Sequence, residues 1–297
     1  MNSEKKLEIK RIVIFCILSV LPFCIVVPII NGVYGKPMFA DEEMMAIAQV
    51  VASLGMFTPA IANVLTRLIT KEGFKDSYLG LNFKGNGRYY AASVLVKLIE
   101  SAVMVGLIWF VYFRGVDAFF ANDYVSERFA ALVMQIGFSI VLFLPAFGEE
   151  FGWRGYLMPK LMGLCGKPLA MVLGGIIWGL WHAPLTVCGH NFGVDYPGFP
   201  WLGILMMCLM CTLINPFFTL LTERTKSIYP ASFAHMINNN LSFAIVLSIF
   251  GNETVVEELG EMSSVPLFEL MMVLLAVTGI ISFVLLMRKD KLKNINN

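Results

Sequence analysis

Long apolar runs, separated by short polar segments, form the dominant pattern along the 297 residues of the chain. A helix that crosses a bilayer needs about 20 mostly apolar residues. Eight stretches meet this requirement, and they cover residues 12–30, 44–65, 89–113, 130–148, 169–187, 201–221, 229–250 and 266–287. The first run is longer than a signal-peptide core and no A-x-A cleavage site follows it, so we expect it to be a span. The pattern predicts an all-α, polytopic membrane protein with about eight transmembrane helices.

Basic residues between the apolar runs predict the orientation of the chain. Eighteen of the 22 Lys and Arg residues lie in the termini and loops of one side, three lie on the other side, and Lys97 lies within a span. Because cytoplasmic loops carry the excess of Lys and Arg, we expect both termini in the cytoplasm. The compact chain without targeting extensions indicates a bacterial cell membrane. No linker, repeat or low-complexity tract is visible, so residues 1–297 are predicted to form a single multispan domain.

Composition agrees with a membrane location and excludes several classes of protein. Charged residues make up 14% of the chain, against roughly 25% in soluble domains, and the mean hydropathy is +0.74. Too few charges remain to cover a soluble surface, so the lipid bilayer is expected to surround most of the exterior. The net charge of +1 provides no basic field, and no nucleic-acid partner is predicted. Cys208 and Cys211 lie within an apolar run and are interpreted as small buried residues.

A charged motif lies at the end of the fourth predicted span. Ionisable side chains at membrane depth are costly and usually face a bundle interior or a cavity. The segment FGEEFGWRGYL holds Glu149, Glu150 and Arg154. Glu150 and Arg154 are four residues apart on a helix, where opposite charges can pair. Glu149 points about 100° away from Glu150 and is available for another partner. The alternative interpretation is an interfacial charge cluster that ends the span.

Other polar residues lie within the later spans. His182 is deep in the fifth span, in IIWGLWHAPL, where the alternative is a packing histidine. His235 and Asn239, in SFAHMINNNL, are four residues apart and share a helix face. Because buried asparagines need partners, the alternative for this span is a helix–helix hydrogen-bond cluster.

Four further positions are interpreted structurally. Lys97 and Glu100 are three residues apart in the third span, and we expect an internal ion pair or a support for the site. Glu269 is expected at the membrane interface. His190, in the loop CGHNFGVDYPG, is expected at the surface because no second ligand lies near it in the sequence.

The polar motifs fall in one layer if the cytoplasmic boundary of the fourth span lies near residues 160–167. Glu149 and His182 are then each about 21 Å into the membrane, and Asn239 is about 20 Å in. We therefore expect the helices to surround a polar intramembrane cavity that opens to the cytoplasmic side. The fourth helix would run from about 130 to 163 and bend at Pro145 or Gly148.

The motifs E-E-x-x-x-R, aromatic-x-x-x-H and H-x-x-x-N, in this order on separate membrane helices, resemble the CPBP family. This is the CAAX prenyl protease and bacteriocin-processing group, also called the Abi family of intramembrane endopeptidases. The matching residues are Glu149, Glu150 and Arg154, then Trp178 and His182, then His235 and Asn239. The resemblance covers a motif-bearing core of about residues 130–250. Trp178 stands where the family more often has Phe, which preserves an aromatic wall.

The resemblance implies that the chain is an intramembrane endopeptidase and assigns roles in peptide hydrolysis. Glu149 and His182 would activate the attacking water. His235 and Asn239 would bind the oxyanion that forms on the substrate.

Glu150, held by Arg154, would orient the site. Two histidines and a glutamate also match the ligand types of a catalytic zinc ion with water as its fourth ligand. Those ligands would be Glu149, His182 and His235. The family has been described both as metalloproteases and as metal-independent glutamate proteases, and we favour the metal-independent form.

The expected partner is a peptide or a membrane-tethered protein substrate. The resemblance allows CAAX-like C-terminal processing of a prenylated protein, maturation of a bacteriocin or signalling peptide, and a self-immunity role. A bacterial source makes the prenylated substrate the less favoured choice. One alternative is a multispan transporter or channel, with Lys97 and Glu100 in its path, although no two-half repeat is visible. Another is a non-catalytic bacteriocin-immunity protein on the same fold.

Overall fold

The computed structural model describes residues 2–40, 42–108, 110, 125–241 and 264–295, and these ranges contain helices and loops but no strand. The helices are α1 (Ser3–Tyr34), α2 (Glu42–Gly55), α3 (Thr58–Ile69), α4 (Gly87–Ile108), α5 (Val125–Gly152), η4 (Trp153–Leu157), α6 (Met158–Trp181), α7 (Ala183–Thr186), α8 (Trp201–Thr225), α9 (Tyr229–Met236), η5 (Ile237–Leu241) and α12 (Ser264–Ile295). The elements η4 and η5 are π-helices. The predicted all-α architecture is confirmed.

Six helical stretches of the described chain are long and apolar enough to cross a membrane, so this is a multi-pass membrane protein. They are Ser3–Tyr34, Glu43–Ile69, Gly87–Ile108, Ser139–Trp181, Trp201–Thr225 and Leu270–Arg288. The predicted fourth span, 130–148, and the predicted fifth span, 169–187, both overlap the single stretch Ser139–Trp181. The predicted seventh span is described only as far as Leu241, and the side chain of Glu269 also lies outside the described part.

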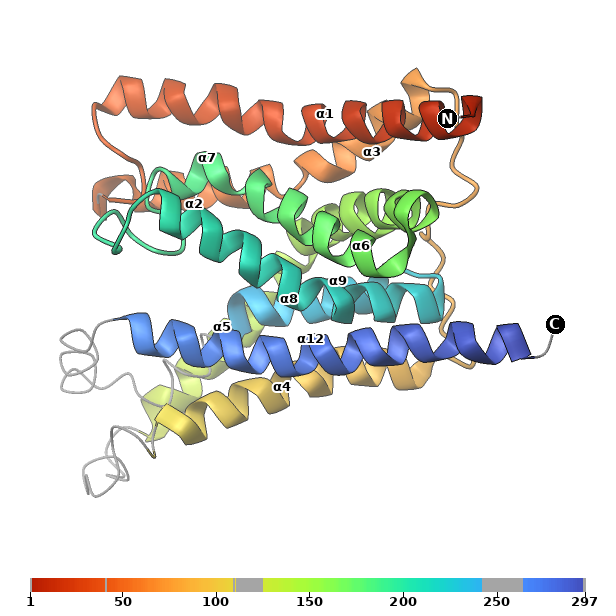
Figure 1. Cartoon of the computed structure of the whole chain (residues 1–297). Coiled ribbons are helices and arrows are strands. Elements are labelled where there is room, and N and C mark those ends of the chain that lie inside the picture. The colour runs from red at the N-terminus through yellow and green to blue at the C-terminus, as the bar shows by residue number, and fades with distance from the viewer. Residues whose placement is uncertain (1, 41, 109, 111–124, 242–263, 296–297) are drawn as a thin grey trace.

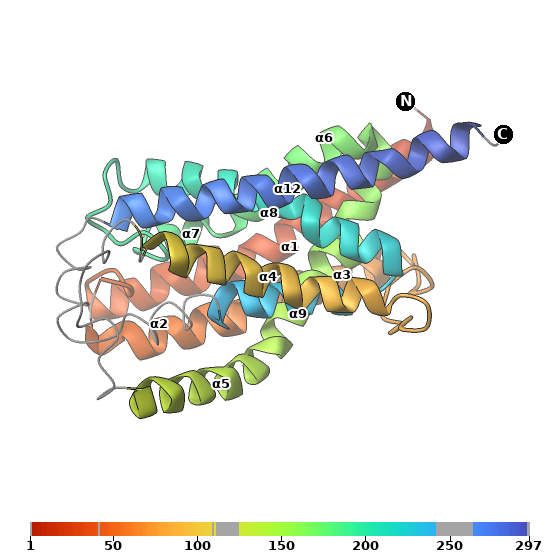
Figure 2. The ribbon, with the colours of Figure 1, turned by 90° about the horizontal axis from the view of Figure 1, so that it is seen from below.

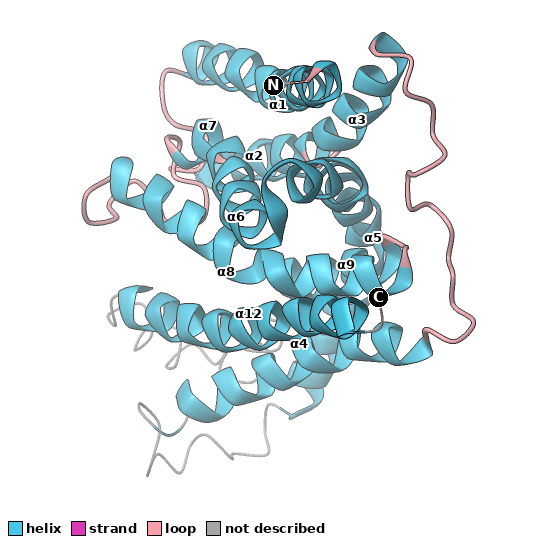
Figure 3. Cartoon of the chain, turned by 45° about the vertical axis from the view of Figure 1, so that its right-hand side comes forward, coloured by secondary structure: helices cyan, strands magenta, loops and turns pink. Residues whose placement is uncertain are grey.

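The helices form three layers (Figures 1 and 3). In both views α1 and α3 lie on one side, α6, α8 and α9 lie in the middle, and α12 and α4 lie on the other side. The start of α1 and the end of α12 lie at the same end of the bundle. Seen from below, α5 follows the outer edge and approaches α9 at its C-terminal end (Figure 2). This approach brings the charged motif of α5 into the middle layer.

Helix α1 is apolar on both of its faces, which is typical of a helix surrounded by protein on one side and lipid on the other. The side chains that pack inward are Phe15, Ser19, Phe23 and Val27. The exposed side chains of the opposite face are Val13, Ile17, Leu21, Ile25 and Ile29. Exposed apolar side chains at this spacing are suited to contact with lipid tails.

Helices α6 and α8 pack with their backbones in close contact. A Cβ atom built on Gly175 would lie 2.3 Å from Thr212 Cα, and one built on Gly179 would lie 2.4 Å from Cys208 Cα. Small residues allow such an approach between membrane helices. Cys208 is therefore part of a helix contact, but it is half-buried and not fully buried as we predicted, whereas Cys211 is buried as predicted.

The charged motif lies on a long, irregular helix. Helix α5 continues without interruption into η4 and α6, and the chain first leaves helical geometry at Gly166, where φ is 76° and ψ is 164°. The predicted long fourth helix is therefore present. The bend was predicted at Pro145 or Gly148. Pro145 lies inside α5, and the geometry changes from α-helical to π-helical at η4.

A cluster of ion pairs joins α1, the turn that follows α3, and α6 at the end of the bundle where the N-terminus lies. Lys160 Nζ is 2.8 Å from Glu8 Oε2 and 2.5 Å from Glu72 Oε1. Glu72 also accepts a hydrogen bond from Tyr156 Oη at 3.0 Å. The side chain of Lys160 is 9% exposed, whereas those of Glu8 and Glu72 are 29% and 18% exposed. The pairs link α1 and α6 through the turn that follows α3.

The close contact between α6 and α8 predicts that Gly175→Ala destabilises the protein. The added Cβ would collide with the backbone of α8, and overpacking of this kind costs about 1–3 kcal/mol. Thermal unfolding in detergent should show a lower midpoint for this variant.

Gly163→Ala is the matched control in the same helix, because nothing lies within 4 Å of its added Cβ. Its midpoint should be equal or higher, since alanine is favoured over glycine in a helix by about 1 kcal/mol. An unchanged midpoint for Gly175→Ala would contradict the close packing.

Candidate active site

The charged motif lies at the end of α5 and in the π-helix η4, and its three charged side chains are buried in the protein interior. A π-helical turn changes the direction in which the following side chains point, and such turns are frequent at functional sites. Glu149, Glu150 and Arg154 are 2%, 0% and 1% exposed, respectively. An interfacial charge cluster would remain in contact with water, so the alternative interpretation of this motif is wrong.

Two side chains of α3 stabilise this irregular segment. Asn63 Nδ2 donates to Phe151 O at 2.8 Å, and Arg67 Nη2 donates to Gly155 O at 3.4 Å. Arg67 Nε also donates to Asn63 Oδ1 at 2.7 Å. Buried carbonyl groups need hydrogen-bond partners, and these donors serve two carbonyls on either side of the start of η4. Neither Asn63 nor Arg67 was predicted from the sequence to be a site residue.

Close packing fixes the position of the motif relative to α3. A Cβ atom built on Gly152 would lie 2.3 Å from Pro59 Cβ and 2.6 Å from Pro59 O. Only glycine permits this approach at the end of α5. The contact fixes the position of Glu149 and Glu150 along the axis of α5, because both residues lie in the helical turn that precedes Gly152.

Glu149 is held by two tryptophan side chains. Its Oε2 atom accepts hydrogen bonds from Trp178 Nε1 at 2.8 Å and from Trp153 Nε1 at 3.1 Å. Within the described chain, no hydrogen bond joins the Oε1 atom of this carboxylate. One oxygen is therefore fixed by indole donors, and the other is available for a ligand or water.

Glu150 links three elements through a single oxygen atom. Its Oε1 atom accepts from Arg154 Nη1 at 2.8 Å and lies 2.7 Å from His235 Nδ1, which belongs to α9. Arg154 Nη2 donates to Asn215 Oδ1 of α8 at 3.2 Å. The predicted pairing of Glu150 with Arg154 is confirmed. Asn215 was missed, although a lone asparagine within an apolar span is a signal that could have identified it.

Trp178 lies at the centre of the aromatic part of the site. The Arg154 guanidinium carbon is 4.2 Å from its ring centroid, a distance typical of a cation–π contact. The ring centroids of His235 and His182 are 5.5 Å and 6.2 Å from that of Trp178. Because its Nε1 atom also donates to Glu149, the side chain contacts four of the predicted site residues. A phenylalanine at this position would provide the ring contacts but not the hydrogen bond.

His182 is fixed by the helix that precedes it. Its Nδ1 atom is 2.9 Å from Trp178 O, and the side chain is 8% exposed. A carbonyl oxygen only accepts hydrogen bonds, so Nδ1 carries the proton and, in the neutral ring, Nε2 has the lone pair.

His190 is not the surface residue that we predicted. It is half-buried, its ring centroid is 4.7 Å from that of Phe39, and it is stacked 6.4 Å from that of His182 with 9° between the planes. Burial lowers the pKa of His190 to about 4, so the residue is neutral near pH 7. The chain folds back between residues 182 and 190, which a linear sequence does not reveal.

Asn239 differs in position from the prediction. His235 is at the end of α9, whereas Asn239 lies in the π-helix η5, so the two residues are not one α-helical turn apart on a regular face. The Asn239 side chain is exposed, and its Oδ1 atom accepts from Asn238 Nδ2 at 3.2 Å. The described contacts do not join it to Glu149 or His182.

The residues predicted as possible metal ligands were tested for fit. Among the residues that the structure describes, no group of three or more His, Cys, Asp and Glu side chains is arranged to hold a metal ion. The donor types of Glu149, His182 and His235 suit zinc, but these three side chains do not form such a group in the described chain. Both histidine rings lie beside the indole of Trp178.

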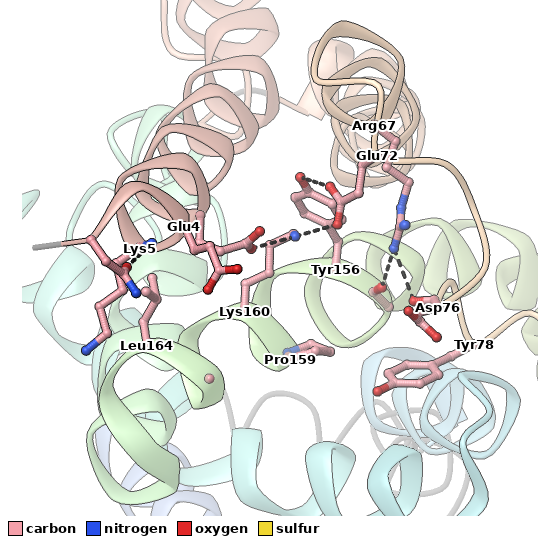
Figure 4. Close-up of a pocket in the computed structure, with 14 residues that line it drawn as sticks. Glu4, Lys5, Arg67, Glu72, Asp76, Tyr78, Tyr156, Pro159, Lys160 and Leu164 are labelled. Carbon is pink, nitrogen blue, oxygen red and sulfur yellow. Dashed lines mark hydrogen bonds and ion pairs between the residues drawn. The ribbon is translucent and has the colours of Figure 1, made fainter.

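A separate polar cavity of about 450 Å³ lies beside the ion pairs of Lys160 (Figure 4). Gly155 and Tyr156 of η4 line it, but none of the predicted site residues does. Its buried cations are bonded within the protein: Lys160 to two carboxylates, and Arg67 to the carbonyls of Gly73, Asp76 and Gly155. The cavity is therefore a structural feature at one end of the bundle.

Residues 128–241 match a protein family described as type II CAAX prenyl endopeptidase, Rce1-like. CAAX prenyl protease 2 of Methanococcus maripaludis is 32% identical over 101 residues, which cover 34% of this chain and 33% of the relative. Lysostaphin resistance protein A of Staphylococcus epidermidis is 25% identical over 245 residues, covering 81% of this chain and 56% of the relative. The Staphylococcus haemolyticus protein of the same name is 24% identical over 245 residues, covering 81% and 59%. The chain thus spans between a third and three fifths of these curated relatives.

The hydrogen bond from Asn63 predicts a stability effect at this site. Asn63→Leu removes the donor to Phe151 O and leaves a buried carbonyl unpaired, which costs about 1–3 kcal/mol. The thermal unfolding midpoint in detergent should fall. Ile61→Leu is the control on the same helix, because Ile61 is 55% exposed and its replacement should leave the midpoint unchanged. Equal midpoints for the two variants would contradict the proposed support of η4.

Proposed function

We propose, from the relationship of residues 128–241 to the Rce1-like type II CAAX prenyl endopeptidases and hence to the CPBP family, that this chain is an intramembrane endopeptidase. The observation that carries the proposal is the buried carboxylate of Glu149. One of its oxygens is held by two indole donors and the other has no hydrogen bond among the described residues. A carboxylate fixed in this way is suited to accept a proton from water.

Water activation is assigned to Glu149 and His182. The tautomer of His182 leaves a lone pair on Nε2, which can accept a hydrogen bond from the same water. The attacking oxygen would form a bond to the carbonyl carbon of the peptide while its proton passes to Glu149. The protonated Glu149 would then give this proton to the leaving amine, so that the carboxylate is restored at the end of the cycle.

Oxyanion binding is assigned to His235 and Asn239. His235 Nδ1 faces the Glu150 carboxylate, so its Nε2 atom can donate to an oxyanion only in the doubly protonated ring. Glu150 offers the counter-charge for that form at 2.7 Å, and Arg154 holds Glu150 in place. Asn239 can donate from its amide without a proton transfer.

The proposed route does not pass through a metal, because the candidate ligands are not arranged around a common centre. The proposed substrate is a peptide or a membrane-tethered protein that reaches the site from the cytoplasmic side, with both termini of the chain in the cytoplasm of a bacterial cell. The relative named CAAX prenyl protease 2 favours processing near a C-terminus. Maturation of a bacteriocin or signal peptide is the other substrate class.

A second candidate function is resistance without catalysis. Relatives named lysostaphin resistance protein A align with 81% of this chain, and a resistance protein could keep the fold without hydrolysing peptides. The buried ionic cluster is expected in both cases, so only an activity measurement separates them.

Replacement of the proposed base should abolish hydrolysis. Glu149→Gln retains the size and the hydrogen bonds to the indoles but cannot take up the proton of water, so we expect a loss of about 10²- to 10⁴-fold in cleavage rate. The purified protein would be incubated with prenylated CAAX peptides and with peptides encoded by neighbouring genes, and mass shifts recorded. Parallel reactions with a chelator should retain full cleavage.

Asp195→Asn is the matched control, because Asp195 is an exposed carboxylate in the loop before α8 and its replacement should not alter cleavage. Cleavage by Glu149→Gln at the wild-type rate would contradict the proposed mechanism. If the wild-type protein cleaves nothing but confers resistance that Glu149→Gln preserves, the non-catalytic function is correct.

Trp178→Phe tests the indole hydrogen bond independently of the aromatic ring. The variant keeps the ring next to the histidines but leaves Glu149 with one indole donor, so the carboxylate is less well positioned. We expect kcat to fall by about 10-fold, since misplacement of a catalytic group by 1 Å can cost as much as 10²-fold, while KM changes little. Trp201→Phe is the control, because Trp201 is 76% exposed. A kcat equal to that of wild type would show that the ring alone matters.

A further inference from the structure

A lysine is fully buried in the middle of α4, beside the proposed active site. The side chain of Lys97 is 0% exposed, and its Nζ atom lies 2.6 Å from Glu100 Oε2. Its Nζ atom is also 5.6 Å and 5.9 Å from the ring centroids of Phe217 and Phe218 in α8. Phe218 in turn is stacked on His235, with centroids 5.4 Å apart. The buried cation therefore shares an aromatic wall with the proposed oxyanion-binding histidine.

The ion pair with Glu100 leaves Lys97 with a further donor. Glu100 Oε1 accepts a hydrogen bond from Thr278 Oγ1 of α12, so both carboxylate oxygens are occupied. An ammonium group has three N–H donors. Lys97 Nζ uses one of the others to donate to Asn238 Oδ1 at 3.2 Å, which links α4 to the π-helix η5. A lysine that only neutralised Glu100 would not need this second hydrogen bond.

The contact with Lys97 fixes the orientation of two successive amides. The orientation of an asparagine amide is inferred from its hydrogen bonds, and an ammonium group only donates. Asn238 therefore directs Oδ1 toward Lys97, and its Nδ2 atom donates to Asn239 Oδ1 at 3.2 Å. Asn239 then uses its oxygen as an acceptor within the protein. Its own Nδ2 atom, with two N–H groups, is left to donate elsewhere.

We propose that Lys97 is a positioning residue that acts through Asn238 to make Asn239 present its N–H donors to the substrate oxyanion. The proposal rests on the proposed endopeptidase function and deepens it. Without the cation, the amide of Asn238 can rotate by 180° and offer its oxygen to no fixed donor. The Asn239 amide can then turn its oxygen, which repels an oxyanion, toward the reacting carbonyl.

Three variants distinguish this relay, which runs from Lys97 through Asn238 to Asn239, from a purely structural ion pair between Lys97 and Glu100. Lys97→Met removes the donor, and Lys97→Arg restores a cation that only donates. Asn238→Asp keeps an acceptor for Lys97 but has no N–H for Asn239. We expect Lys97→Met and Asn238→Asp each to lower kcat by about 10- to 100-fold with little change in KM, because one oxyanion donor is worth about 10²- to 10³-fold in kcat. Lys97→Arg should recover most of the loss.

A double-mutant comparison tests whether Lys97 acts through Asn239. In an Asn239→Ala background the donor is already absent, so Lys97→Met should cost no further activity. Lys84→Met is the control, because Lys84 is exposed and lies in the loop before α4. If Lys97→Met lowers kcat equally in both backgrounds, or if Asn238→Asp retains wild-type kcat, the relay is overturned.

A second measurement does not depend on activity. Side-chain amide resonances of protein labelled with ¹⁵N-asparagine can be recorded in detergent, and the Asn239 pair identified by its loss in Asn239→Ala. Lys97→Met should shift this pair, and Lys97→Arg should restore it. Unshifted Asn239 resonances in Lys97→Met would overturn the relay even if the protein cleaves peptides. If the wild-type protein shows no Glu149-dependent cleavage, the proposed function is wrong. The Asn239 resonances still show whether Lys97 sets the orientation of the Asn239 amide.

Discussion

One buried carboxylate oxygen, Glu150 Oε1, holds the middle layer of the structure together. Arg154 of η4 and His235 of α9 share it. It thereby joins Glu150 to a histidine that is 85 residues further along the chain. Removing one partner from a buried ion pair leaves an uncompensated charge and typically costs about 3–5 kcal/mol. The positions of η4, α8 and α9 therefore depend on one another, because each supplies a group that this cluster needs, including Asn215 for the guanidinium.

Aromatic rings surround these buried charges. The guanidinium of Arg154 lies over Trp178 and near Phe218, and the ring of His235 packs against the same two side chains. The quadrupole of an aromatic face attracts a cation in a low-dielectric environment. Trp178 adds a hydrogen bond to Glu149. Trp178 thus contacts both parts of the motif: it donates to Glu149, and its ring faces Arg154 and His235, which hold Glu150.

Both ends of the proposed site involve π-helices, and each is supported by polar side chains from another helix. Asn63 bonds to the backbone carbonyl next to η4, while Lys97 bonds to the first asparagine of η5. Such π-turns are frequent at functional sites. Polar residues of α3 and α4 outside the predicted motifs thus contact the segments that carry the motif residues, so the motifs describe only part of the proposed site.

The sequence by itself determined the helical class, the membrane environment and the pairing of Glu150 with Arg154, because apolar length and i,i+4 spacing are local properties. It did not predict that Trp178 would hold Glu149, nor that His190 would stack near His182, because both depend on how segments far apart in the sequence pack. The regular face expected for His235 and Asn239 was lost for the same reason. Tertiary contacts stabilise a π-turn between them, and 3.6-residue periodicity no longer gives the direction of a side chain once that turn has formed.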